Sequence, residues 1–333
     1  MKTFKRIIAA VVMTAMLCVC LPAFAAVSPE YPEVPEGYDG YVTFAVSALT
    51  MGWTYIIDPV LIPVHEGESL AEMTTRAFDM LGWSYNSGTG EYGYYLSGIG
   101  CYETEPNVPD YLMEQIEAYP AWAEENLGYN LGEWTGTYVD DEMLSEFEYC
   151  TLSGWMLLED NVSIPSTADD VTVKIGSVYT WIYTIYGWGM DYGISDGWGC
   201  FPAFDNPMEG VDRTEASRMI ALIDADEELM ELLTENEYEK VIDFLMAFYD
   251  PEATQEEIDS TLAALLEVLD TNEYESGDVN MDGVLDISDA LSIMRAAMGI
   301  EKLSDRAMEL ADVNGDGSVN MTDALLVLRN TLA

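Results

Sequence analysis

Residues 277–299 read GDVNMDGVLDISDALSIMRAAMG, in which acidic and amide side chains alternate around a glycine before an apolar helical pattern begins. Calcium is a hard cation that takes about six to eight oxygen ligands, which a loop supplies from such alternate positions. The stretch 312–333 aligns with 278–299 at a spacing of 34 residues without a gap, and nine of the 22 aligned positions are identical. A short tandem repeat is a supersecondary unit that needs its copy to bury a core. The repeat therefore favours paired calcium loops over a solvated acidic turn.

Each loop supplies oxygen ligands for one ion, so we expect two calcium ions. Gly283 and Gly317 provide the sharp turn at the centre of each loop. The twelfth position is Asp where a complete EF-hand has Glu, and NEYESG, which precedes the first loop, is no apolar entering helix. Each repeat is thus expected to be a loop followed by a helix. The predicted ligands are Asp278, Asn280, Asp282, Val284, Asp286 and Asp289, then Asp312, Asn314, Asp316, Ser318, Asn320 and Asp323.

The helices that follow the two loops carry matched apolar positions, which predict one helical face in duplicate. Ile287, Leu291, Met294 and Met298 recur 34 residues later as Met321, Leu325, Leu328 and Leu332. With these features residues 277–333 resemble a dockerin domain, the small all-α module that docks secreted proteins onto a cohesin of a scaffoldin, as in cellulosomes. Dockerin loops carry Asp at the twelfth position, in agreement with this sequence.

The resemblance implies that positions 10, 11 and 18 of each repeat contact the cohesin. Ile and Met at position 10 depart from the Ser/Thr pairs of the best-known cellulolytic clostridial dockerins, which leaves the cohesin type open. These two side chains also lie on the apolar stripe, so a core position is the alternative. The near-symmetry of the two sets implies two binding orientations. The expected contact residues are Ile287, Ser288, Arg295, Met321, Thr322 and Arg329.

The composition places the rest of the 333-residue chain outside the cell. Residues 1–25 have a basic start, an apolar stretch and the cleavage signal Ala23-Phe24-Ala25, which predict a signal peptide, with an uncleaved anchor as the alternative. The formal charge of −49, from 61 acids and 12 basic residues, repels nucleic acid and anionic membranes. We therefore expect no nucleic-acid partner, no membrane insertion, and a secreted protein held near the cell surface through a scaffoldin.

Residues 41–207 follow a flexible leader at 26–40 and show an α+β order of elements. Strands are expected at 41–49, 58–67, 94–99, 153–160, 171–176 and 179–187, and helices at 69–83, after a capping box, and at about 109–127. HEGESLAEM (65–73), YYLSGIG (94–100), SGWMLLED (153–160) and VTVKIGSVYTWIYTIYGWGMDYG (171–193) resemble the transcobalamin C-terminal-like β-grasp domain of unknown function. The order of elements predicts a helix packed across a mixed sheet, with the helix at about 109–127 as an insertion. The segment between Gly100 and Ser153 is longer than the family pattern. The resemblance offers a corrinoid as a small-molecule ligand.

Residues 210–270 read as three helices, the last of which follows a second capping box at Thr254 and Glu257. The run 235–270 resembles half of a FIVAR-type helical module of Gram-positive surface proteins, so a spacer or packing role is expected. The chain as a whole is thus predicted to hold a β-grasp-like domain, a three-helix module and a dockerin at 277–333.

Two functions remain open for residues 41–207. The first is a non-catalytic module that binds a polysaccharide or a small molecule, because the segment holds many aromatic residues that could stack on sugars. The second is a glycoside hydrolase, which needs two carboxylates about 5–10 Å apart; Asp140, Asp141 and Glu142 are not distinguishable from solvated charges, and no catalytic residue is assigned. Beyond the signal peptide three cysteines remain, so one disulfide and a fully reduced chain are both open. They are Cys101, Cys150 and Cys200.

Overall fold

The computed structural model divides the chain into two compact units, with the division between Ala263 and Ala264. It describes residues 31–90, 93–101, 105–130, 142–194, 199–225, 238–270, 276–280, 284–300, 302–303 and 305–331. The predicted signal peptide and the start of the leader lie outside these residues. No helix in the described ranges is long and apolar enough to cross a membrane.

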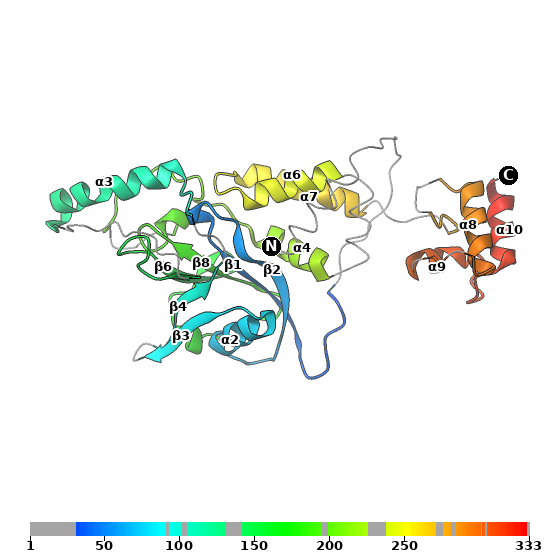
Figure 1. Cartoon of the computed structure of the whole chain (residues 1–333), viewed down its shortest axis with the longest axis horizontal. Coiled ribbons are helices and arrows are strands. Elements are labelled where there is room, and N and C mark those ends of the chain that lie inside the picture. The colour runs from blue at the N-terminus through cyan, green and yellow to red at the C-terminus, as the bar shows by residue number, and fades with distance from the viewer. Residues whose placement is uncertain are drawn as a thin grey trace. The chain divides into compact units, whose positions relative to one another are not determined.

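The first unit is built around a five-stranded mixed sheet with the strand order β2-β1-β8-β6-β7 (Figure 1). The central pair, β1 and β8, runs parallel, whereas β1–β2 and β6–β8 are antiparallel. A smaller antiparallel sheet, β3-β4-β5, accompanies it. The strands are β1 (Gly40–Ser47), β2 (Tyr55–Val64), β3 (Tyr85–Gly90), β4 (Gly93–Gly100), β5 (Met143–Ser145), β6 (Gly154–Glu159), β7 (Val162–Ser163) and β8 (Val178–Thr184).

One face of the large sheet packs on helix α2 (Leu70–Leu81). Phe44 of β1 meets Phe78 of α2 edge to face at 5.5 Å, and the Trp181 indole N–H of β8 donates to the Thr74 hydroxyl at 3.3 Å. Leu70, Met73 and Ala77 of the helix are buried, whereas Met80 is exposed.

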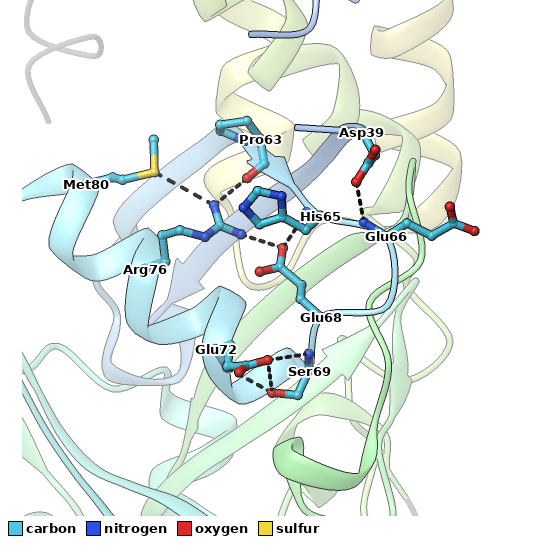
Figure 2. Close-up of polar contacts among 9 residues, drawn as sticks. All are labelled: Asp39, Pro63, His65, Glu66, Glu68, Ser69, Glu72, Arg76 and Met80. Carbon is cyan, nitrogen blue, oxygen red and sulfur yellow. Dashed lines mark hydrogen bonds and ion pairs between the residues drawn. The ribbon is translucent and has the colours of Figure 1, made fainter. Parts of the chain in front are cut away.

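Helix α2 begins where its capping box predicts. Figure 2 shows Ser69 accepting a hydrogen bond from the Glu72 backbone N–H while the Glu72 carboxylate accepts one from the Ser69 N–H. One turn further along, Arg76 pairs with Glu68 and donates to the Pro63 carbonyl. This side chain joins the helix to the end of β2, which fixes the angle at which α2 crosses the sheet.

The other face of the sheet is covered by helices α4 (Thr214–Ala225) and α6 (Tyr238–Tyr249). Tyr55 of β2 stacks on Phe248 at 4.8 Å, and burial raises the pKa of Tyr55 to about 12. Arg213 donates to the Phe248 carbonyl at 3.2 Å and so holds the start of α4 against the end of α6. Because both faces are covered, all of β1 is buried, as is typical of a strand in a parallel pair. Helices α4 and α6 of the predicted helical module thus contact the sheet of the first unit, and the module itself stays a prediction.

Several further elements complete this unit. Helix α3 (Asp110–Leu127) confirms the predicted helix. Helix α7 (Gln255–Asp270), within which the division between the units falls, begins after the predicted capping box of Thr254 and Glu257. Short 3-10 turns lie at η1 (Leu49–Met51), η2 (Ala168–Asp170) and η3 (Met190–Tyr192). No disulfide joins Cys101, Cys150 and Cys200 in the structure. The mixed α+β class is confirmed, and the β-grasp assignment stays a prediction.

The strand predicted at 171–176 is wrong, since the segment forms only an isolated bridge between Thr172 and Ser69. Backbone groups of Val171 and Val173 bond to the start of α2, and only Gly176 at the end of the segment donates to a strand, at the Tyr41 carbonyl. The Leu70 N–H donates to the Val171 carbonyl at 2.8 Å, and the Val173 N–H donates to the Glu68 carbonyl at 3.0 Å. The chain then turns at Gly176, whose φ of +85° lies in the left-handed region that favours glycine.

The second unit holds helices α8 (Ile287–Ala297), α9 (Asp305–Ala311) and α10 (Met321–Thr331), with α8 and α10 side by side (Figure 1). Small side chains dominate its core, and each helix that follows a loop contributes two matched positions. The buried core residues are Val279, Ala290, Ile293, Ala307, Ala311, Ala324 and Val327.

The predicted apolar stripe does not form the core face of these helices. Met294 and Leu328 lie partly buried against the core, and Leu332 lies outside the described residues. The other members of the stripe are exposed: Ile287, Leu291, Met298, Met321 and Leu325. The buried face lies one position to the side, on Ala290 and Ile293 and their copies, where short alanine side chains let the two helices approach.

Candidate calcium-binding and docking site

The twelfth position of each loop holds a fully buried carboxylate that ties together two distant points of its own loop. Asp289 accepts hydrogen bonds from the backbone N–H of Asn280 at 3.2 Å and of Asp286 at 2.9 Å. Asp323 accepts the equivalent bonds from Asn314 at 3.3 Å and from Asn320 at 2.9 Å. The sequence repeat is thus a repeat of loop geometry, with the third and ninth positions drawn to the twelfth.

The ninth position of each loop caps the helix that follows. The Ser288 N–H donates to the Asp286 carboxylate at 2.7 Å, and the Thr322 N–H donates to the Asn320 side-chain oxygen at 2.8 Å. The two hydrogen bonds from Ser288 lower the pKa of Asp286, so this carboxylate stays ionised. A side chain predicted to lie near calcium therefore also starts each helix in register with its loop.

The centre of the second loop turns its N–H groups toward its own acidic side chains. Asp312 accepts from the N–H of Asp316 at 3.0 Å and of Gly317 at 2.7 Å, and Asn314 also accepts from Asp316 at 2.8 Å. Gly317 has a φ of +80°, so glycine at this position has a conformational reason. The corresponding centre of the first loop, including Asp282 and Gly283, lies outside the described residues.

The remaining predicted ligands differ in their exposure to solvent. Asp278 is buried, whereas Asn280, Val284, Asn314, Asp316 and Ser318 are exposed. Among the residues that the structure describes, no three acidic, histidine or cysteine side chains converge tightly enough to hold an ion alone. Loops of this type complete the coordination with amide and backbone carbonyl oxygens, which both copies offer. The donor chemistry therefore fits calcium, whose hard character matches carboxylate, amide and carbonyl oxygens.

Gly277 belongs to this site but was not predicted from the sequence. Gly277 stands just before the first ligand with a φ of +107°, and a Cβ atom there would meet Val327 at 2.7 Å and Leu285 at 3.0 Å. Its N–H donates to the Leu310 carbonyl at 2.8 Å, at the end of α9. Gly277 thus lets the first loop close against the second repeat. A glycine one residue before a calcium loop is the signal that could have revealed it.

All six predicted partner-contact positions lie on the surface of this unit. Ile287 and Met321 are exposed, which removes the alternative that they are core residues. The other four, at positions 11 and 18 of the repeats, are exposed as well, although the Ser288 hydroxyl donates to Asp286. The two sets occupy equivalent places on α8 and α10, the two helices that pack side by side.

Comparisons with known proteins agree with this assignment for the C-terminal unit. Residues 276–332 match the family model of the dockerin type I domain. The match supports calcium binding and cohesin binding by this segment. Among curated proteins nothing matches. A crystal structure from Ruminococcus gnavus, provisionally described as a metal-binding protein, matches at 10% identity and a TM-score of 0.22, with 44% of this chain and 97% of that chain covered. The chain therefore carries a type I dockerin domain at residues 276–332.

Proposed function

We propose that the chain is a secreted protein that docks onto a cohesin through a dockerin folded around two calcium ions. The observation that carries this is the duplicated loop, in which Asp289 and Asp323 are fully buried and make the same two hydrogen bonds to their own loops. Buried carboxylates are costly unless a cation or a charged partner compensates them. Secretion rests on the predicted signal peptide, and attachment to the cell surface rests on the scaffoldin that would carry the cohesin.

Calcium in this proposal is a folding ligand. The fully buried part of the core consists mainly of alanine with two valines and one isoleucine, and the larger apolar side chains around it are only partly buried, so apolar burial alone stabilises the unit weakly. Binding free energy of an ion that only the folded loop can coordinate is added to the folding free energy. Each loop would hold one ion with the twelve predicted ligand positions shared equally between them.

The docking face is proposed to lie on α8 and α10, around the six exposed contact positions. Arg295 and Arg329 end equivalent helices and supply positive charge on a strongly acidic chain, which suits an acidic patch on a cohesin. Because the two sets are equivalent, either helix can face the partner. The exposed apolar residues Leu291 and Leu325, which the core does not use, would be buried on binding.

A binding assay on the mature full-length chain with a panel of cohesins tests this proposal. We expect binding in calcium that is lost in chelator, mild losses for Arg295→Ala and for Arg329→Ala, and a severe loss for the double variant. Lys302→Ala, which removes an exposed positive charge elsewhere in the unit, is the matched control. Binding that persists in chelator would sink the calcium role. A single arginine substitution that abolishes binding would exclude the two orientations.

We further propose that the first unit is the cargo, and that it binds a ligand without catalysis. A glycoside hydrolase needs a carboxylate that can reach its substrate. The buried carboxylate of Asp191 instead accepts three hydrogen bonds from its own chain, at 2.6 Å from Thr184 Oγ1, 2.6 Å from the Ile185 N–H and 3.1 Å from the Tyr186 N–H. Asp140 and Asp141 lie outside the described residues, and Glu142 is exposed with a φ of +70°. Release of reducing sugar from polysaccharides by the mature chain would revive the hydrolase alternative.

A further inference from the structure

Two loops of the first unit leave the large sheet at the same end. Strands β6 and β8 lie next to each other (Figure 1) and are antiparallel. Gly154 at the start of β6 pairs with Thr184 at the end of β8. The loop that precedes β6 (146–153) and the loop that follows β8 (185–189) therefore emerge next to each other. Nothing in the docking function of the other unit uses this end of the sheet.

Each of these loops presents one exposed aromatic side chain from a left-handed backbone. Phe147 has a φ of +63° and is 59% exposed, and Trp188 has a φ of +53° and is 49% exposed. A bulky residue at positive φ is a rare conformation that costs free energy, and it persists only where the surroundings impose it. Asp160 and Asn161, also at positive φ, form the tight turn between β6 and β7 and need no further reason.

The first loop is fixed to the end of β8 by buried side chains. The Cys150 thiol donates to the Ile185 carbonyl at 3.0 Å, and burial raises the pKa of this thiol to about 11, so it remains a protonated donor. The Tyr183 hydroxyl lies 2.8 Å from the Ser145 carbonyl and 3.0 Å from the Ser153 hydroxyl. The turn that carries Phe147 is therefore held by the strand from which the second loop departs.

The second loop is fixed by Asp191, which binds the N–H groups at its start and the Thr184 hydroxyl. Thr184 in turn accepts from the Gly189 N–H at 2.8 Å, so both sides of Trp188 are held. The Trp188 ring rests edge to face on Phe201 at 5.2 Å. An exposed indole with a fixed backbone and a fixed neighbour loses little conformational entropy on binding.

We propose that Phe147 and Trp188 form an aromatic platform on which the sugar rings of a neutral polysaccharide stack. Flat aromatic rings offer a large apolar surface to the C–H faces of a sugar, and the neighbouring loops place two such rings at one end of the sheet. The net charge of −49 repels polyanions, so a neutral chain of sugars is the compatible polymer. This inference rests on the proposed role of the first unit as a binding module and names its ligand class and contact residues.

Affinity electrophoresis of the mature full-length chain through gels that contain hydroxyethyl cellulose, arabinoxylan or galactomannan tests the platform. The variants are Trp188→Gly and Phe147→Gly, because glycine accepts the positive φ at both sites. Tyr95→Ala is the matched control, since Tyr95 is 52% exposed on β4 of the other sheet. We expect retardation of the wild-type chain in at least one gel, a roughly tenfold loss of affinity for each glycine variant, and no change for the control.

A second variant distinguishes the loss of the aromatic ring from a loss of the fold. Trp188→Phe keeps an aromatic face and should retain most of the affinity, whereas Trp188→Gly should lose it while the melting temperature stays within a few degrees. If the wild-type chain is retarded and Trp188→Gly is retarded equally, the platform is wrong and the binding module survives. If no gel retards the wild-type chain, both the platform and the carbohydrate-binding role are overturned. Cohesin binding is independent of either outcome.

Discussion

The two units solve the same problem, a buried carboxylate, in different ways. In the first unit Asp191 lies under a large core of aromatic and aliphatic side chains, and three hydrogen bonds from its own chain satisfy it. In the second unit Asp289 and Asp323 are equally buried, but the core around them is mostly alanine. In the first unit, these hydrogen bonds and the surrounding core fix the position of the carboxylate. In the second, we expect a cation to compensate the two carboxylates, because the core around them is small.

The two units should therefore respond differently to metal and to pH. Hydrogen bonds and a large core hold the carboxylate of Asp191, so the first unit should be insensitive to metal. Ionisation of this buried carboxylate should destabilise the fold of the first unit. If Asp289 and Asp323 bind calcium as proposed, ionisation of these carboxylates should stabilise the second unit, and removal of the metal should destabilise it. A change that affects one unit therefore leaves the other unit as an internal control.

The largest effect is expected from removal of calcium. Chelator should lower or abolish the unfolding transition of the second unit, because an ion at about 1,000 times its dissociation constant contributes about 4 kcal/mol to the free energy of unfolding. The transition of the first unit should stay where it is. Scanning calorimetry of the mature full-length chain, with calcium and with chelator, measures both at once. A second-unit transition that chelator leaves unchanged would contradict the folding role of calcium.

The next largest effect is expected from Asp191→Ala. This substitution leaves the Ile185 and Tyr186 N–H groups buried without their acceptor, and each such group costs about 1–3 kcal/mol. The free energy of unfolding of the first unit should fall by about 3 kcal/mol, as measured by urea unfolding. Asp205→Ala, at an exposed acid of the same unit, should change it by less than about 0.5 kcal/mol. Equal effects of the two substitutions would show that Asp191 does not hold its loop.

A smaller effect, of opposite sign in the two units, is expected from pH. Burial raises the pKa of Asp191 from 3.8 to about 6, so the unfolded chain releases this proton first as the pH rises. The contribution is present below about pH 4 and is lost through about pH 6, and it amounts to about 3 kcal/mol at most. In the second unit acid weakens calcium binding, because protons compete for the same carboxylates.

The difference between the wild-type chain and Asp191→Asn isolates this group from the other acids. The neutral amide keeps the shape, so the stability difference between the two first units should change between about pH 4 and pH 6 and be flat above it. Urea unfolding at four pH values in that range measures it. A difference that does not change with pH would show that Asp191 does not titrate there.

The sequence predicted most of the elements because their signals are local. The capping boxes at Ser69 and Thr254 and the apolar alternation of β1 and β8 appear where they were expected. Strand β3 was missed because its residues, YNSGTG, are polar and mostly exposed, so only pairing with β4 makes it a strand. The segment 171–176 has strand-like residues, yet it bonds to the start of α2. Pairing partners of this kind are tertiary facts that no local pattern contains.

The assignment of the calcium ligands stays a prediction, but the two loops repeat at the predicted spacing, whereas the core face of the helices depends on packing. Ligand positions follow from what calcium requires, and the hydrogen bonds of Asp289 and Asp323 repeat at the same spacing. The core face of α8 and α10 was misplaced because the large apolar residues dominate the periodicity, while alanines form the contact. Positive φ at Phe147 and Trp188 has no sequence signal at all.

The smallest effect is expected from a substitution on the face of α10 that lies outside the core. Such a substitution distinguishes docking from folding in the second unit. Leu325 is exposed and Val327, two residues further along α10, is fully buried in the core. Leu325→Ser should change the calcium-loaded stability by less than about 0.5 kcal/mol, whereas Val327→Ala should cost roughly 1–2 kcal/mol. If Leu325 packed as the apolar periodicity suggests, the serine variant would be the more damaging of the two. Thermal melts in calcium compare them, and a cohesin assay on Leu325→Ser then shows whether the exposed leucine is kept for the partner.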